Sequence, residues 1–178
     1  MKKILLMLAL TLGTISYSQE VEFTFTTDGL TDYVITQCEG KTESEIYKKC
    51  IEWIKINYNN PNEVILSTIE DKFIRFQGSG GSGLVKYYRH GGIFTPDSRY
   101  IIELSIKEGK YKFDLINLET YSGTVWHEAD CFFSRNKNCY NSKGEFKKDY
   151  KFYNEISDYF NKINLSLKEK VLGSDEKW

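Results

Sequence analysis

The side chains best suited to metal binding are concentrated at His127–Cys131, which reads His-Glu-Ala-Asp-Cys. Four of its five residues carry ligand atoms. Zinc enzymes use His-Glu-x-x-His on a helix, whereas here Cys131 replaces the second histidine and no helical pattern surrounds it. Cys131 is also expected to form a disulfide with Cys139, and a bridged cysteine has no thiolate to bind a metal. We therefore interpret this segment as a solvated loop, and we expect neither a metal site nor a cofactor.

Nucleophilic catalysis would require one of the two histidines, His90 and His127, as its base. The His90-Gly91-Gly92 sequence is similar to the oxyanion loop of esterases, but no G-x-S-x-G nucleophile motif accompanies it. Paired carboxylates depend on their separation in space, so the sequence leaves them open. We predict no catalytic residues, and a hydrolase is the least favoured function.

The segment Gly78–Gly83 matches the spacing G-x-G-x-x-G of dinucleotide-binding loops. In that motif a helix follows at once, because its N-terminus holds the pyrophosphate. Here Leu84–Tyr88 follows, and its pattern is that of a strand. We therefore predict a hairpin loop or a bulge in a strand, and no cofactor site.

Four cysteines indicate disulfides if the chain is exported. Cys131 and Cys139 flank a polar stretch and are the disulfide candidate. Cys50 falls on the apolar stripe of an expected helix, where a buried thiol behaves as a small apolar side chain. A second bridge between Cys38 and Cys50 remains an alternative, because spacing does not show whether the Cβ atoms meet.

The first 18 residues have the pattern of a cleaved signal peptide. Lys2 and Lys3 precede an apolar run that is too short to span a bilayer, and Ser16 and Ser18 provide small residues before the expected cut. The mature chain then begins at Gln19, and we expect an exported protein, either periplasmic or secreted, with no transmembrane segment after cleavage.

The charge balance argues against nucleic acid as a partner. The formal net charge is −1, with an isoelectric point near 6.2, and loss of Lys2 and Lys3 makes the mature chain more acidic. Nucleic-acid-binding domains usually carry a basic stripe. The same balance removes an electrostatic reason for binding an anionic membrane surface.

The stretch Arg99–Leu118 predicts a β-hairpin at the centre of the fold. Apolar residues alternate on both sides of Glu108–Gly109, and glycine tolerates the positive φ that such a turn needs. One face of this hairpin must be covered by an amphipathic element. Further strands are expected at 20–27, 33–36, 63–68, 73–77 and 84–88.

Two helices are the expected covers. Thr42 and Glu45 form a capping-box pattern, and apolar residues recur every three or four positions from there to Tyr58. A long C-terminal helix is expected from Glu145 to the stop at Gly173, again with a continuous apolar stripe. We interpret residues 19–172 as one domain, with a loop excursion at 122–144 and a polar tail at 173–178.

This order of elements resembles a known family of small exported bacterial proteins, which carry a domain of unknown function with a TATA-binding-protein-like (TBP-like) fold. The likeness covers residues 20–121 and rests on KTESEIYKKCIEWIKINY, EVILSTIEDKFIRFQGSG and YIIELSIKEGKYKFDLINL. It implies an α+β fold of the order β-α-β(4)-α, with an N-terminal and a long C-terminal helix on one face of a curved antiparallel sheet. It implies no catalytic residues, and the fold's name does not bring DNA binding with it.

We therefore expect an exported, non-enzymatic binding module. Its first version is a carrier of a small apolar ligand such as a lipid. The alternative is a module for protein–protein interaction or cell-envelope maintenance. A large internal cavity favours the carrier, whereas a packed core with exposed aromatic residues favours the protein partner.

Overall fold

The computed structural model describes residues 22–26, 28–129 and 139–173. The expected signal peptide and most of the polar tail lie outside these residues. Among the helices described, none combines the length and the apolar character needed to span a bilayer.

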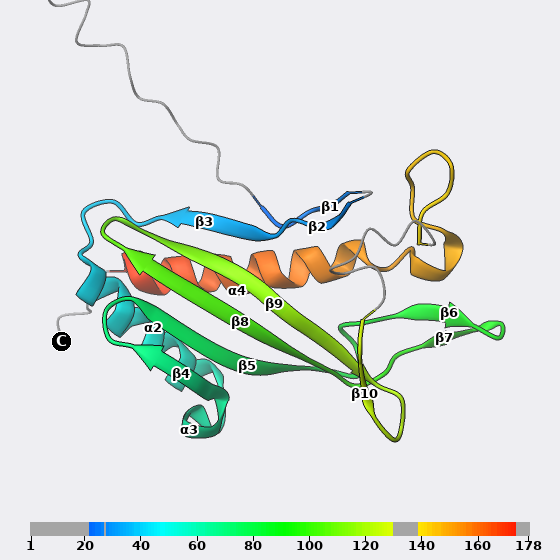
Figure 1. Cartoon of the computed structure of the whole chain (residues 1–178), viewed down its shortest axis with the longest axis horizontal. Coiled ribbons are helices and arrows are strands. Elements are labelled where there is room, and N and C mark those ends of the chain that lie inside the picture. Colours follow the sequence, from blue (N-terminus) through cyan, green and yellow to red (C-terminus); the bar gives the residue numbers. More distant parts are fainter. Residues whose placement is uncertain (1–21, 27, 130–138, 174–178) are drawn as a thin grey trace, which may run out of the picture.

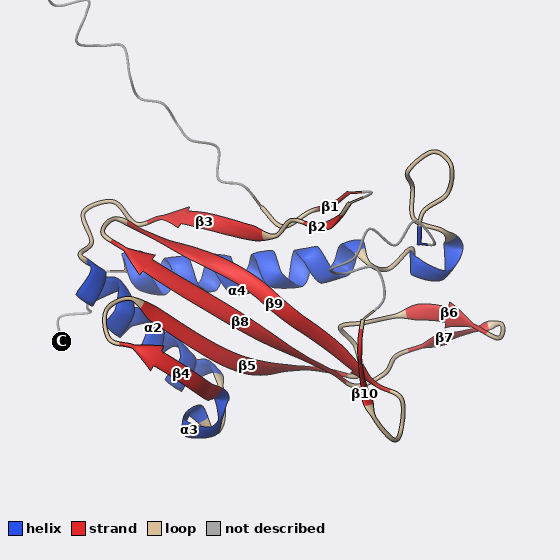
Figure 2. Ribbon diagram, in the orientation of Figure 1, coloured by secondary structure: helices blue, strands red, loops and turns tan. Residues whose placement is uncertain are grey.

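A six-stranded antiparallel sheet forms the body of the molecule (Figures 1 and 2). Its main path runs β10-β9-β8-β5-β4, and β3 pairs with β9 on the same edge as β10, at the other end of that strand. The strands are β3 (Tyr33–Gln37), β4 (Ile65–Ile69), β5 (Phe73–Gly81), β8 (Ser98–Lys107), β9 (Lys110–Tyr121) and β10 (Trp126–Glu128). Two small hairpins flank it: β1 (Phe25–Thr26) with β2 (Gly29–Leu30), and β6 (Tyr87–Arg89) with β7 (Gly92–Phe94).

The central hairpin is β8–β9, as the alternation predicts. Its turn is Glu108–Gly109, and Gly109 has φ 73°. Inward residues of β8 are almost fully buried, while their neighbours are only partly covered. The buried residues from the two strands are Tyr100, Ile102, Leu104, Ile106, Tyr111, Phe113, Leu115 and Leu118.

Helices α2 (Glu43–Asn57) and α4 (Asn154–Leu172) cover one face of the sheet, and the other face is open (Figure 1). The capping box predicted for α2 is present: Glu45 N–H donates to Thr42 Oγ1, and Thr42 N–H donates to Glu45 Oε2 at 2.8 Å. Side chains from both helices, such as Ile54 and Phe160, are fully buried against the strands. The predicted α+β architecture is confirmed.

The C-terminal helix begins later than predicted. A turn occupies the start of the expected helix, because Asn141 Oδ1 accepts hydrogen bonds from the N–H groups of Lys143 and Glu145. Phe146 then forms a β-bridge with Tyr140 and stacks on its ring. A 3₁₀ helix, Lys148–Tyr150, leads from this turn into α4.

The first expected strand is also shorter than predicted. Only Phe25–Thr26 is a strand within 20–27, and residues 20, 21 and 27 lie outside the described part. Phe23 is instead held by the side chain of Asn161 in α4, which accepts from Phe23 N–H at 2.8 Å and donates to Phe23 C=O at 3.0 Å. The Asn161 side chain thus makes the two main-chain hydrogen bonds that a neighbouring strand would otherwise make.

Three further boundaries differ from the prediction. Helix α3 (Pro61–Val64) takes the start of the expected strand at 63–68. Leu84 and Val85 are buried in the core, so the strand expected at 84–88 begins only at Tyr87. Part of the expected loop excursion forms β10, which returns to pair with the end of β9.

Candidate functional site

An open cleft of about 700 Å³ lies where β4 stops covering the edge of β5. We call it the Tyr100 cleft. Strand β4 pairs with β5 only over Phe73–Phe76, because α3 carries the preceding chain away from the sheet. Pro61 stands in the first turn of α3, where its missing N–H costs nothing.

Gly78 gives the cleft its shape. It is the register partner of Tyr100 on β8, and a Cβ built on Gly78 would lie 2.3 Å from the Tyr100 ring. The ring therefore lies over the bare backbone of β5. At Gly80 a Cβ would collide with Leu84 and Ser98 in the same way.

Most of the glycine-rich segment, Gly78–Gly81, is the end of β5 and contains a bulge, and Ser82 and Gly83 form the turn that follows. The register between β5 and β8 shifts between Ser79 and Gly81. Of the two structures that the sequence left open, the bulge is correct, and its glycines permit close packing. No helix follows the segment, as a dinucleotide site would require.

Three tyrosine hydroxyls meet inside the cleft. Tyr100 Oη lies 3.0 Å from Tyr58 Oη and 3.3 Å from Tyr159 Oη. Burial raises the pKa of Tyr58 to about 12. The pKa of Tyr100 is raised as well, first by burial and then by the neighbouring Tyr58. The hydroxyls of Tyr58 and Tyr100 therefore stay protonated near neutral pH and provide hydrogen bonds.

Arg99 and Trp126 form the wall of the cleft on the open side of the sheet. The Arg99 guanidinium lies 4.4 Å from the centre of the Trp126 ring and forms an ion pair with Glu119. A cation between an aromatic face and a carboxylate is held in place and neutralised.

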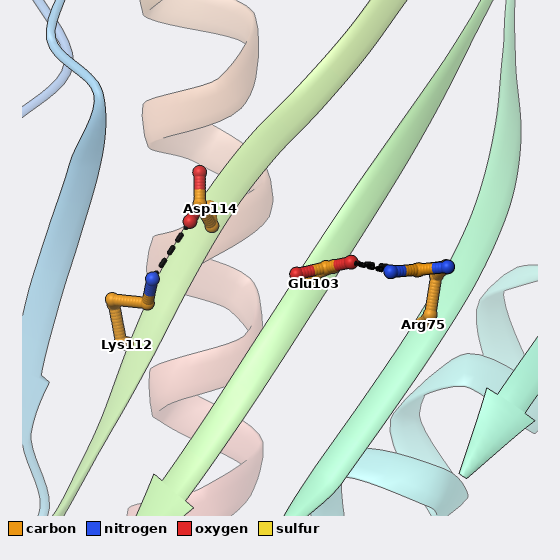
Figure 3. Close-up of polar contacts among 4 residues, drawn as sticks. All are labelled: Arg75, Glu103, Lys112 and Asp114. Atoms are coloured by element: carbon orange, nitrogen blue, oxygen red, sulfur yellow. Dashed lines mark hydrogen bonds and ion pairs between the residues drawn. The ribbon is translucent and has the colours of Figure 1, made fainter.

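The rest of the open face repeats this arrangement of paired charges. Figure 3 shows Arg75 with Glu103, and Lys112 with Asp114 at 2.7 Å. Arg75 also lies over the Phe73 ring, and Lys112 over the Tyr33 ring. Each of these two cations therefore has its own carboxylate, which neutralises its charge on this part of the face.

Four other polar side chains that line the cleft are available to a ligand. Among the described residues, no hydrogen bond or ion pair engages the side chains of Asn59, Asn60, Glu63 or Gln77. Amide and carboxylate groups can form hydrogen bonds with the main chain of a ligand, while the aromatic rings beside them contact its flat apolar surfaces.

The residues singled out for catalysis or metal binding do not assemble in this way. His127 and Glu128 line a second cleft of about 750 Å³, and His127 Nε2 lies 3.1 Å from Ser122 Oγ. Ser122 Oγ also donates to Val125 C=O within the same turn, and no described carboxylate accepts a hydrogen bond from the His127 ring. We interpret the contact as a brace of the β9–β10 turn.

The other candidates are dispersed. His90 is exposed at the tip of the β6–β7 hairpin, with φ 48°. Asp130 and Cys131 lie outside the described residues, and within the described part no three potential ligands form a metal cluster. The bridge between Cys131 and Cys139 therefore stays a prediction; Cys139 itself is fully buried.

Cys38 and Cys50 are both fully buried as thiols, so the alternative bridge between them is not formed. Burial raises the pKa of the Cys50 thiol, and the neighbouring Cys38 raises it further. This agrees with the interpretation of Cys50 as a small apolar core residue.

The structure resembles two solved structures of low sequence identity. One is a DUF4468 family protein from Bacteroides ovatus, with a TM-score of 0.64 and 15% identity, over 91% of this chain and 95% of that one. The other is a TBP-like protein from Parabacteroides distasonis, with a TM-score of 0.53 and 11% identity, over 80% and 92%. No protein-family model matches the chain, and no curated protein matches it. These likenesses confirm the predicted TBP-like fold.

Proposed function

We propose that this chain is an exported, non-enzymatic module for protein–protein interaction, and that it binds its partner in the Tyr100 cleft. The observation that carries the proposal is the cleft itself. Aromatic rings and unengaged polar side chains from α2, α3, β5, β8, β10 and α4 converge there around an uncovered strand edge. Elsewhere the space between sheet and helices is filled by large side chains such as Phe113 and Phe160.

A carrier of a small apolar ligand is less well supported. Such a site is expected to be mainly apolar and enclosed. Both clefts carry charged side chains, including Glu63 in the first and Arg89 in the second, and the first carries amide side chains as well. A hydrolase is supported least, because the described residues that line the Tyr100 cleft include no pair of carboxylates and no histidine.

Site-specific photocrosslinking tests the proposal. The amino acid p-benzoylphenylalanine replaces Asn60, which is exposed beside the cleft, in the full chain expressed in its own host. The matched control carries it at Lys107, exposed at the far end of β8. We expect one defined protein adduct from position 60 and none from position 107.

Once the captured protein is purified, its binding affinity for this chain must depend on residues of the cleft. Trp126→Ala removes the ring that holds Arg99, and we expect it to weaken binding about tenfold, as for a central interface residue. Tyr33→Ala, an exposed ring at the other end of the open face, is the control for loss of an aromatic surface. Adducts of equal yield at both positions, or equal affinity for wild type and Trp126→Ala, would contradict the proposal.

A further inference from the structure

Backbone groups of β5 point into the Tyr100 cleft. Lys72 C=O, just before β5, accepts a hydrogen bond from Ile106 N–H at 2.8 Å. In an antiparallel pair successive residues point their N–H and C=O groups to opposite sides. The register is regular from Phe73 to Ser79, so Gly78 faces β8, whereas Gln77 and Ser79 face the side where β4 would lie.

Among the described residues, no strand pairs with that side of β5 beyond Phe76. Strand β4 ends its pairing with β5 at that residue, and α3 leads the chain away. Within the described chain, no loop, turn or side-chain hydrogen bond involves Ser79 N–H or C=O. An uncovered strand edge of this kind is a template for another extended chain.

We infer that the Tyr100 cleft binds an extended peptide segment of the partner protein, which continues the line of β4 and pairs with β5 at Gln77–Ser79. This inference rests on the proposed function and names the form in which the partner binds. Main-chain hydrogen bonds to a strand edge supply affinity, and pockets for alternate side chains supply specificity.

The cleft offers different surroundings to alternate side chains of such a peptide. A residue opposite Gly78 faces the helix side of the sheet, where the Tyr100 and Tyr58 rings lie. Its two neighbours face the open side, beside Trp126 and the neutralised Arg99.

The charge of the cleft selects further among peptides. Arg99 is paired with Glu119, whereas Glu63 has no ion-pair partner among the described residues. The cleft is therefore acidic, and a basic residue close to an aromatic or β-branched one is the expected pattern. A nucleic acid fits neither this charge nor a strand edge.

The test uses linear heptapeptides selected from a phage-displayed library on the purified mature chain. Their affinity is then measured for Ser79→Pro and for its matched control, Ser79→Ala. Proline removes the outward N–H and is tolerated at a strand edge, whereas alanine keeps the N–H. We expect a loss of about tenfold or more for Ser79→Pro and less than about twofold for Ser79→Ala.

Hydrogen exchange of wild-type protein keeps the test decisive if Ser79→Pro fails to fold. The bound peptide should slow exchange of the Ser79 amide, while the amide of Lys107, at the far end of β8, keeps its rate. Glu63→Gln should weaken peptides with a basic residue and leave neutral peptides unchanged.

The inference is overturned if no heptapeptide is selected, if Ser79→Pro and Ser79→Ala bind alike, or if exchange at Ser79 is unaffected. These outcomes are separate from failure of the proposed function. A partner crosslinked at position 60 and dependent on Trp126, without any effect at Ser79, would preserve the interaction module and remove strand addition.

Discussion

The buried hydroxyls of Tyr58 and Tyr100 make stability sensitive to alkaline pH. A tyrosine in the unfolded chain ionises near its ordinary pKa of 10.0, whereas burial raises the pKa of Tyr58 in the folded protein to about 12. Because the folded pKa is raised, the unfolded state loses protons first as the pH increases. The free energy of unfolding should be unaffected by this group below pH 10.0 and fall between there and about 12.

Tyr58→Phe should therefore flatten this decline, since it removes one group whose ionisation favours the unfolded state. The measurement is denaturant unfolding at a series of pH values from neutral to about 11. Tyr33→Phe, in which an exposed ring loses its hydroxyl, is the matched control. An equal decline in wild type and Tyr58→Phe would show that burial of this hydroxyl is not what links stability to pH.

Helix α2 depends on its first turn. Thr42 Oγ1 accepts a hydrogen bond from Glu45 N–H, and Glu45 Oε2 accepts from Thr42 N–H. Thr42→Ala removes one half of this pair and should lower the free energy of unfolding by about 1 kcal/mol. Urea denaturation measures the change.

Thr42→Ser retains the hydroxyl and should lie within a few tenths of a kcal/mol of wild type. If the alanine and serine variants were equally destabilised, the loss would come from the threonine methyl group, and the capping role would be wrong.

Short sequence patterns predict the helices and strands that are determined by residues close together in the chain. The capping box at Thr42 and the alternation around Gly109 suffice to place α2 and the β8–β9 hairpin, and both are found. The start of α4 fails this test, because Phe146 belongs by spacing to the helical stripe but stacks on Tyr140 instead. Such aromatic contacts depend on the folded molecule, and helical periodicity does not distinguish them.

The candidate site is harder to predict for the same reason. Gly78, Tyr100 and Tyr159 come from β5, β8 and α4, and only the register of β5 against β8 and the position of α4 bring them together. The glycine-rich segment is the one signal in the sequence that marks the site. Its meaning, close packing under a tyrosine ring, requires the pairing of Gly78 with Tyr100.

At the scale of the whole molecule, the closed core should protect two thiols. Cys38 and Cys50 are completely buried in the core, and burial raises the pKa of the Cys50 thiol. Iodoacetamide reacts with an exposed thiolate. We expect both residues to be alkylated only as fast as the protein unfolds, as measured by mass spectrometry of the peptides that contain them.

Protein unfolded in guanidinium chloride is the control, and both cysteines should be modified there within minutes. Separate peptides keep Cys139 and Cys131 out of this comparison. Modification of Cys50 in native protein at the unfolded rate would show that the core opens far more readily than its packing indicates.

The hold of Asn161 on Phe23 joins the beginning of the described chain to its last helix, across 138 positions of sequence. A chain that emerges with its N-terminus first therefore cannot complete this contact until α4 has followed. Until then the longest helix does not cover the sheet, and residues such as Phe113 and Tyr111, which are buried in the finished fold, face solvent. The fold therefore cannot be completed before the C-terminal helix is synthesised, and the apolar face of the sheet stays exposed until that point.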